Sequence, residues 1–371
     1  MSAPNPPDPN EKSLELSGKY AGILQSSQIQ WQAGRQLERV LGAGGQGQVF
    51  LSRKYGAGDF SLPVALKIFS PDRFKTADDY RTEMRRIVRV AAEVACIQHD
   101  NVVDVQDFID LDGIIVMEME WVDGLDLRCL LTPAVMQQVR DHASREHWKQ
   151  LNRAVITEGQ AQSRVKPGMA IAIFRECLHG LASLHAANMV HNDLKPSNIM
   201  LKRSGNVKLI DIGSAFSLTD APDNVACTPE FAAPEILVGE RASAQSDLAS
   251  LGYVLLEMLS GTRLFCDMKY NAMLAAKQDI LQSLPTILPS EEFAYFDLLL
   301  PFLRRLVAPN PNDRFRSAEE ADQAADGAAA FEEELVKGDL SHSYEIDIRE
   351  WIKEIDGVIL DHNLPSTRSL S

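Results

Sequence analysis

Residues 191–198 read His-Asn-Asp-Leu-Lys-Pro-Ser-Asn, and no other stretch of the chain says as much about its structure. This short loop carries a carboxylate on Asp193, an ammonium group on Lys195 and a carboxamide on Asn198. Transfer of a phosphoryl group to a hydroxyl needs an acceptor for the hydroxyl proton, a cation beside the transferred group and an oxygen ligand for Mg²⁺. The three side chains match these needs in that order.

A second carboxylate follows at a short distance in the sequence. Asp211 ends the apolar run Leu209-Ile210 and precedes Ile212-Gly213, so it is expected at the end of a buried strand. A carboxylate in that position can bind the same metal from another side. Each residue alone would more often be structural, but two such sets close together favour a site for a metal and a phosphate.

Residues 42–49 read Gly-Ala-Gly-Gly-Gln-Gly-Gln-Val and predict a loop that binds phosphate through backbone N–H groups. Dinucleotide-binding folds share the G-x-G-x-x-G pattern, but there the loop leads into a helix. Here Val49-Phe50-Leu51 continues as a strand, which favours a hairpin that covers phosphates. An ordinary glycine-rich hairpin turn is the remaining alternative.

Lys67 closes the apolar strand Val64-Ala65-Leu66 and could neutralise the α- and β-phosphates of a nucleotide. A strand-end lysine is otherwise a surface residue with a buried aliphatic stem. Such a phosphate-binding lysine needs a carboxylate to hold it, and the helix predicted at 78–97 offers Glu83 and Glu93. We prefer Glu83 because it lies nearer Lys67 in the sequence, while Glu93 stays open and either could be a solvated helix carboxylate.

The composition excludes several classes of function. With 52 acidic and 37 basic residues the net charge is −15, which disfavours nucleic acid and anionic lipid as main partners. None of the 5 cysteines forms a C-x-x-C pair, so we expect reduced thiols and a cytoplasmic location. No apolar run approaches the ~18 residues that a membrane span requires, and the N-terminus lacks the pattern of a secretory signal.

The whole set of motifs resembles the eukaryotic-like (Hanks-type) serine/threonine protein kinase family over about residues 36–320. The resemblance implies an α+β fold with two lobes: a small antiparallel sheet with one main helix, and a larger, mostly helical lobe. It implies ATP and Mg²⁺ as cofactors and serine or threonine hydroxyls of proteins as acceptors. Asp-Leu-Lys-Pro-Ser-Asn is the form of the loop seen in serine/threonine kinases, whereas tyrosine kinases differ there.

Individual roles are carried over from the family to the matching positions. Asp193 resembles the catalytic base and Lys195 the lysine at the γ-phosphate, with Lys67 and Glu83 as the lysine–glutamate pair. Asn198 and Asp211 resemble the two Mg²⁺ ligands, and Arg314 would pair with Glu235. The positions implied in binding nucleotide are the glycine loop Gly42, Ala43, Gly44, Gly45, Gln46, Gly47 and Val49; Val49, Ala65 and Met200 around the adenine ring; Met119 as the gatekeeper before the hinge; the hinge backbone of Glu120 and Val122; and Asp126 at the ribose.

Two positions depart from the family pattern. Asn192 stands where many relatives have an arginine that pairs with a phosphorylated activation loop, so we predict activity without phosphorylation of that loop. Ile212 replaces a phenylalanine that packs beside the metal-binding aspartate. Neither change removes a charged catalytic group, and a catalytically silent pseudokinase scaffold that binds nucleotide and partner proteins is the alternative function.

The sequence also predicts how the chain is divided. In the tail, Ile348, Trp351, Ile352 and Ile355 form an apolar helical stripe, which we expect to pack on the chain's own helical lobe. The competing interpretation is that this helix, or the insertion at 132–168, docks a partner protein. The expected boundaries are a flexible tail at 1–30, the N-lobe and hinge at 31–122, the C-lobe at 123–326 with its helical insertion at 132–168, and a C-terminal helical extension at 327–371.

Overall fold

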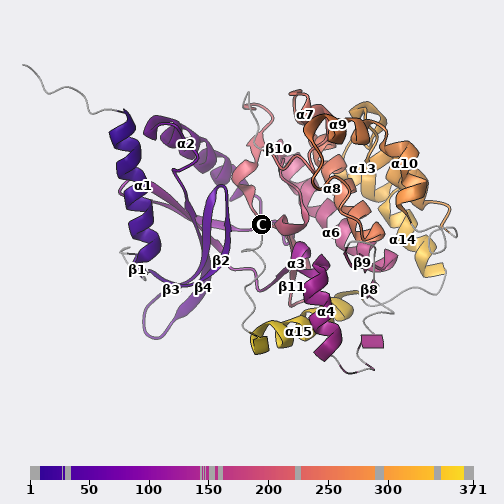
Figure 1. Cartoon of the computed structure of the whole chain (residues 1–371), viewed down its shortest axis with the longest axis horizontal. Coiled ribbons are helices and arrows are strands. Elements are labelled where there is room, and N and C mark those ends of the chain that lie inside the picture. Colours follow the sequence, from indigo (N-terminus) through magenta and orange to yellow (C-terminus); the bar gives the residue numbers. More distant parts are fainter. Residues whose placement is uncertain are drawn as a thin grey trace, which may run out of the picture. The chain divides into compact units, whose positions relative to one another are not determined.

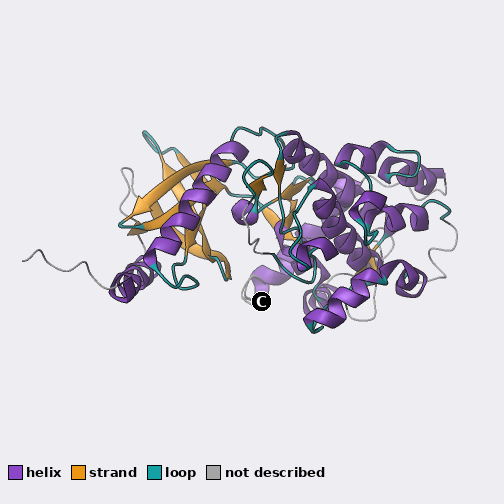
Figure 2. Ribbon diagram, turned by 90° about the horizontal axis from the view of Figure 1, so that it is seen from above, coloured by secondary structure: helices purple, strands orange, loops and turns teal. Residues whose placement is uncertain are grey.

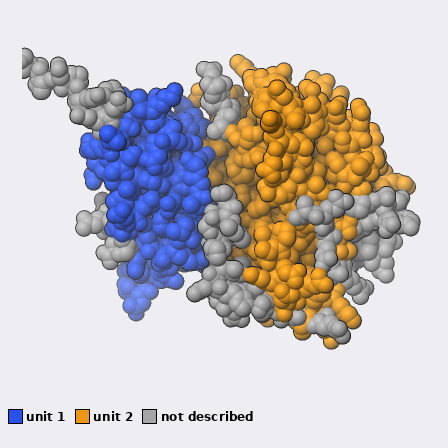
Figure 3. Space-filling view, viewed as in Figure 1, with its two compact units in different colours: residues 1–98, 103–122, 363–371 blue, residues 99–102, 123–362 orange. Residues whose placement is uncertain are grey.

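The structure is a computed structural model of the whole chain, and it describes residues 9–26, 28–29, 35–142, 144, 146, 148–149, 155–157, 162–221, 227–288, 296–337 and 344–362. The chain divides into two compact units (Figure 3). Unit 1 comprises residues 1–98, 103–122 and 363–371, and unit 2 comprises residues 99–102 and 123–362. Within the described residues no helix has both the length and the apolarity needed to cross a membrane.

Unit 1 is built on an antiparallel sheet (Figures 1 and 2). The sheet has six strands in the order β1-β2-β3-β4-β6-β5. Helix α2 packs on this sheet with one apolar face, which includes Tyr80, Met84, Ile87 and Val94. A capping box at Thr76 begins the helix, because its side chain and that of Asp79 each accept from the other's backbone N–H. The elements are α1 (Pro9–Gln25), β1 (Gln28–Ile29), β2 (Arg35–Gly44), β3 (Gly47–Tyr55), β4 (Ser61–Phe69), α2 (Ala77–Val94), β5 (Val105–Leu111) and β6 (Ile114–Glu120).

Helix α1 corrects one expectation from the sequence. The flexible tail predicted at 1–30 is wrong for Pro9–Gln25, which forms a helix that contacts α2 and β6. Leu16 and Tyr20 lie four residues apart on one face and are both buried. Ser17 donates a hydrogen bond of 2.8 Å to Asp72, in the connection between β4 and α2. Burial of this short apolar stripe outweighs the polar composition of the segment.

Unit 2 is mainly helical, with two long buried helices, α6 and α8, at its centre (Figure 1). Arg175 on α6 pairs with Asp322 at 2.7 Å and with Glu332, which ties α6 to α13 and α14. The elements are β7 (Gly124–Asp126), α3 (Leu127–Leu131), α4 (Pro133–His142), β8 (Ile156–Thr157), β9 (Arg164–Val165), α6 (Pro167–Ala186), β10 (Met189–Val190), η1 (Pro196–Asn198), β11 (Ile199–Lys202), β12 (Val207–Leu209), η2 (Ile212–Ser214), β13 (Phe216–Ser217), α7 (Pro234–Leu237), α8 (Ala244–Ser260), α9 (Tyr270–Gln278), α10 (Ile280–Ile287), α12 (Leu299–Leu306), η3 (Pro311–Asp313), α13 (Ala318–Gln323), α14 (Ala328–Lys337) and α15 (Tyr344–His362).

The C-terminal helix α15 packs against α4 and α6 of its own unit. The predicted stripe of Ile348, Trp351, Ile352 and Ile355 is buried, with Trp351 fully enclosed. The expectation that this stripe packs on the chain's own helical unit is therefore confirmed. In the insertion at 132–168, the helix predicted after Thr132 is α4. The insertion is not helical throughout, because β8 and β9 form an antiparallel pair within it. Residues 143, 145, 147, 150–154 and 158–161 lie outside the described part.

Candidate active site

The loop between β10 and β11 carries the catalytic candidates of unit 2, and Asp247 holds it in place. Asp247, at the start of α8, accepts hydrogen bonds from the backbone N–H of His191 at 2.9 Å and of Asn192 at 2.8 Å. Asn192 adopts φ 65°, a left-handed conformation that asparagine tolerates better than most residues. The buried carboxylate of Asp247 thus fixes the backbone immediately before Asp193.

Asp193 lies in a tight cluster with Lys195 and Thr228. Lys195 Nζ is 2.7 Å from Asp193 Oδ2 and donates to Thr228 Oγ1 at 2.9 Å. Thr228 donates to Asp193 Oδ1 from its hydroxyl at 2.6 Å and from its backbone N–H at 3.1 Å. A carboxylate held by these donors keeps one defined orientation, which is what a positioned proton acceptor requires.

Asn198 and Asp211 are brought together by the hairpin of β11 and β12. Asn198 Nδ2 donates to the backbone oxygen of Asp193 at 2.7 Å and to its carboxylate at 3.2 Å. Ile210 N–H donates to the backbone oxygen of Asn198 at 2.9 Å, which ties the residue before Asp211 to Asn198. Asp211 has φ 64° and ψ 71°, and its side chain accepts from Gly213 N–H at 3.3 Å.

These two side chains fit a magnesium ion bound jointly with phosphate. Because the amide nitrogen of Asn198 binds two acceptors, its carboxamide oxygen, which has no partner within the described residues, is left for a hard cation. Among the described residues no cluster of three His, Cys, Asp or Glu side chains forms a metal cage. Mg²⁺ usually takes one or two protein oxygens and completes its shell with phosphate and water.

The glycine loop of unit 1 is the turn between β2 and β3. Gly44 pairs with Gly47 across this antiparallel hairpin, and β3 continues as a strand, so the dinucleotide-binding alternative does not apply. Gly47 has φ 134°, and a Cβ atom there would lie 2.0 Å from the carbonyl oxygen of Ile68. Only glycine fits at this position, because any side chain would force the hairpin away from β4.

Lys67 and Glu83, both in unit 1, have different partners in this structure. Lys67 lies on β4 between Val49 and Met117, is buried, and donates to Gln46 Oε1 of the glycine loop at 2.6 Å. Glu83 accepts from Arg86 at 2.9 and 3.0 Å. The expected pairing of Lys67 with Glu83 is absent from this arrangement, and Glu93, the second candidate, is exposed.

The adenine-pocket candidates are divided between the units. In unit 1 Ala65 and Met119 are partners across β4 and β6, both are buried, and Glu120 ends β6. In unit 2 Met200 on β11 pairs with Asp126 on β7. Asp126 also caps α3, since its carboxylate accepts from Cys129 N–H at 2.8 Å.

Comparisons with known proteins identify the family of the chain. The family model described as "Protein kinase domain" matches residues 35–325. The chain belongs to the protein kinase family. It is 29% identical over 300 residues to serine/threonine-protein kinase PknE of Mycobacterium bovis, covering 79% of this chain and 46% of PknE. It is 29% identical over 305 residues to PrkC of Bacillus subtilis, covering 80% of this chain and 40% of PrkC. It therefore spans less than half of the length of these curated relatives.

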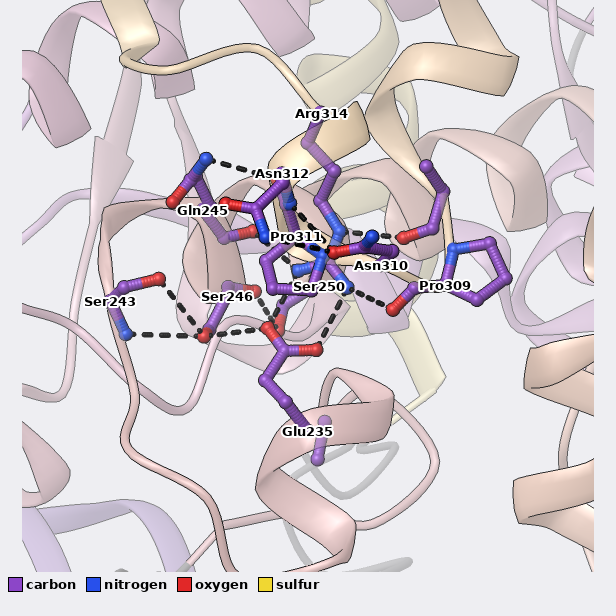
Figure 4. Close-up of polar contacts among 12 residues, drawn as sticks. Glu235, Ser243, Gln245, Ser246, Ser250, Pro309, Asn310, Pro311, Asn312 and Arg314 are labelled. Atoms are coloured by element: carbon purple, nitrogen blue, oxygen red, sulfur yellow. Dashed lines mark hydrogen bonds and ion pairs between the residues drawn. The ribbon is translucent and has the colours of Figure 1, made fainter.

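A buried ion pair anchors the segment that follows Thr228 in this kinase domain (Figure 4). Arg314 donates to both carboxylate oxygens of Glu235, at 2.6 and 2.8 Å, and to the backbone oxygens of Gln245, Ala308 and Pro309. Burial raises the pKa of Glu235, but hydrogen bonding and charge pairing with Arg314 outweigh it and leave this pKa below its ordinary value. The predicted pair of Arg314 and Glu235 is confirmed.

The contact that Thr228 makes with the candidate base could not be predicted from the sequence. The only local signal is that Thr228 carries a hydroxyl group directly before Pro229. Its contact with Asp193 spans 35 residues of the sequence. Such a contact depends on the tertiary fold and not on local spacing.

Proposed function

We propose that this kinase domain transfers the γ-phosphoryl group of ATP to serine or threonine hydroxyls of protein substrates. The observation that carries the proposal is the cluster of Asp193, Lys195 and Thr228, in which a carboxylate, an ammonium group and a hydroxyl are linked within hydrogen-bond distance. Both relatives, PknE and PrkC, are named serine/threonine-protein kinases, which supports the same reaction. The activity of the whole protein is part of this proposal.

In the proposed reaction Asp193 orients the acceptor hydroxyl and takes its proton onto a carboxylate oxygen. Lys195, which bridges Asp193 and Thr228, stabilises the negative charge on the transferred group. Asn198 and Asp211 would hold Mg²⁺ through their side-chain oxygens. When bound, Mg²⁺ neutralises the charge on the β- and γ-phosphates.

Unit 1 would bind the rest of the nucleotide. Backbone N–H groups of the loop at 42–47 would cover the phosphates, and Lys67 would leave Gln46 to bind the α- and β-phosphates. Val49, Ala65 and Met200 would enclose adenine, the backbone of Glu120 and Val122 would bind its edge, and Asp126 would reach the ribose. Lys67 is already buried beside the glycine loop, which supports this assignment.

We further propose that activity does not depend on phosphorylation of the activation loop. Asn192 is buried, and its side-chain amide points inward, 3.5 Å from the backbone oxygen of Ser214. A neutral, buried amide offers no charge to a phosphate group. In kinases that need phosphorylation, the phosphate group orders the activation loop. In this chain Thr228, which already binds Asp193 and Lys195, would supply that order.

The test compares the wild-type chain with Asp193→Asn, using autophosphorylation and phosphorylation of peptides from a serine/threonine library. Loss of a positioned base should lower the rate by about 10²–10⁴-fold. Asp141→Asn is the matched control, because Asp141 is exposed on α4 and should leave the rate unchanged. Equal, near-zero rates in the wild type and in Asp193→Asn would overturn the proposal and favour a catalytically silent scaffold.

A further inference from the structure

Lys277 on α9 is a buried lysine that the mechanism above does not use. Its side chain has no exposed surface, and within the described residues it makes no ion pair. Its ammonium nitrogen donates to the backbone oxygens of Glu230 at 2.9 Å and of Ala232 at 2.6 Å. Burial of an ammonium group is costly unless its donors are satisfied, so these two carbonyl groups must be held within reach.

Two aromatic rings complete the surroundings of this ammonium group. Lys277 Nζ lies 4.3 Å from the ring centroid of Tyr253 on α8 and 4.4 Å from that of Phe265. The two rings meet edge to face at 5.2 Å. Ring faces attract cations, and a buried site strengthens that attraction. The two rings therefore stabilise the ammonium group of Lys277, and its hydrogen bonds go to the backbone of residues 230–232.

The segment held by Lys277 begins at the catalytic cluster. Thr228 binds Asp193 and Lys195 with its hydroxyl, and its backbone oxygen accepts from the N–H groups of Phe231 and Ala232, both at 3.0 Å. A short turn thus links the candidate base to the two residues that flank Phe231. Any acceptor hydroxyl must approach the carboxylate of Asp193, so residues 228–232 border the place where a substrate peptide would lie.

We propose that Lys277 is a positioning residue for the protein substrate: its ammonium group fixes the backbone of residues 230–232, and through Thr228 it sets the surface beside Asp193 that receives the acceptor peptide. This inference rests on the proposed kinase activity. The inference assigns to Lys277 an effect on peptide binding and none on nucleotide binding. The reason is that its ammonium group contacts the backbone of Glu230 and Ala232 and the rings of Tyr253 and Phe265.

The geometry also predicts a dependence on pH. Burial lowers the pKa of Lys277 to about 7, and Cys227, Glu230 and Glu235 oppose that shift in part. The titratable groups that face it are Cys227 and Glu230 of the segment, Glu235 on α7 and Tyr253 on α8. Charge-assisted hydrogen bonds are stronger than neutral ones, so the hold on residues 230–232 weakens as the pH rises through neutrality.

The experiment measures KM and kcat for an acceptor peptide, selected from a library with the wild-type chain, between about pH 6 and pH 8.5, a range that brackets the titration of Lys277. Lys277→Met keeps the length of the side chain and removes the ammonium group. Its KM for peptide should rise roughly tenfold near pH 6.5, as expected for lost hydrogen bonds from a charged donor. Its KM should then be flat with pH, while its KM for ATP stays at the wild-type value.

Lys269→Met is the matched control, because Lys269 is exposed at the N-terminal end of the same helix. It should keep the wild-type increase in peptide KM with pH. A KM and a pH profile of Lys277→Met equal to those of the wild type would overturn the inference. A wild-type chain that phosphorylates no peptide would instead refute the proposed kinase activity.

Amide hydrogen exchange gives a second readout that needs no activity. The amides of Phe231 and Ala232 should exchange faster in Lys277→Met than in the wild type or Lys269→Met at the same pH. Unchanged exchange would contradict the role of Lys277. If Lys277→Met fails to fold, the wild-type profile alone decides, since a peptide KM that does not change with pH would overturn the inference.

Discussion

The hydroxyl of Thr228 lies 2.6 Å from Asp193 Oδ1, and Lys195 Nζ contacts both residues. The candidate base is thus oriented by a residue of the segment that runs from Thr228 to Glu235 as well as by its own loop. The same segment continues to Glu235, whose carboxylate is held by Arg314. One stretch of chain therefore joins the candidate base to the buried ion pair of unit 2.

Removing the hydroxyl of Thr228 should lower kcat. Thr228→Val keeps the shape but deletes a hydrogen bond to a charged group, worth about 1.5–3 kcal/mol, so kcat should fall roughly 10–100-fold. Thr228→Ser restores the donor and should recover most of the activity in the same assay. Equal kcat values for Thr228→Val and the wild type would show that the contact does not orient the base.

Glu235→Gln should destabilise unit 2. Arg314 is buried, and removing the charge of its partner leaves an uncompensated guanidinium group, at a cost of about 3–5 kcal/mol. Urea unfolding near pH 7 measures this cost. Glu240→Gln is the control, because Glu240 is exposed just after α7 and should change the free energy of unfolding little.

The same pair predicts a change of stability with acid. The pKa of Glu235 is lower in the folded chain than its ordinary value of 4.5. Its contribution is therefore fully present above pH 4.5 and is lost as the pH falls through the lower, folded pKa. The difference in unfolding free energy between the wild type and Glu235→Gln should therefore shrink as the pH falls below 4.5 and through the folded pKa of Glu235. A constant difference would contradict the assignment.

The local parts of the site could be predicted from the sequence because their residues are close in the chain. Asp193, Lys195 and Asn198 share one loop, and β11 and β12 form a hairpin that returns directly to Asp211. Thr228 and Lys277 could not be assigned in the same way, because their contacts depend on tertiary packing. Lys277 in particular reads as an ordinary helix lysine until its aromatic surroundings are known.

Two other predictions differ from the structure for physical reasons that sequence patterns do not reveal. Glu83 was assigned to Lys67 across two elements, yet Arg86 lies three residues away on the same helix and takes the carboxylate. In α1, Leu16 and Tyr20 form only a two-residue stripe in a polar segment. The amino-acid composition reveals neither the competition of Arg86 for Glu83 nor a buried stripe of only two residues.

Treatment of the protein with a phosphatase should leave its kinase activity nearly unchanged. Asn192 offers no charge to a phosphate on the activation loop, and Thr228 already orders the segment at Asp193. The measurement compares initial rates before and after dephosphorylation, with mass spectrometry to verify loss of phosphate. A large loss of activity that rephosphorylation restores would refute the prediction.

Trp351 should be a core residue of unit 2, although it lies in the C-terminal extension. Its side chain is fully enclosed where α15 meets α4 and α6, and Trp351→Ala should cost about 3–5 kcal/mol of unfolding free energy. Ile346→Ala on the same helix is the control, because that side chain is 50% exposed and its loss should change stability by less than about 0.5 kcal/mol. Urea unfolding of the full chain compares the two. If both variants unfold like the wild type while substrate choice changes, α15 is a docking helix and its buried stripe contributes little to the fold.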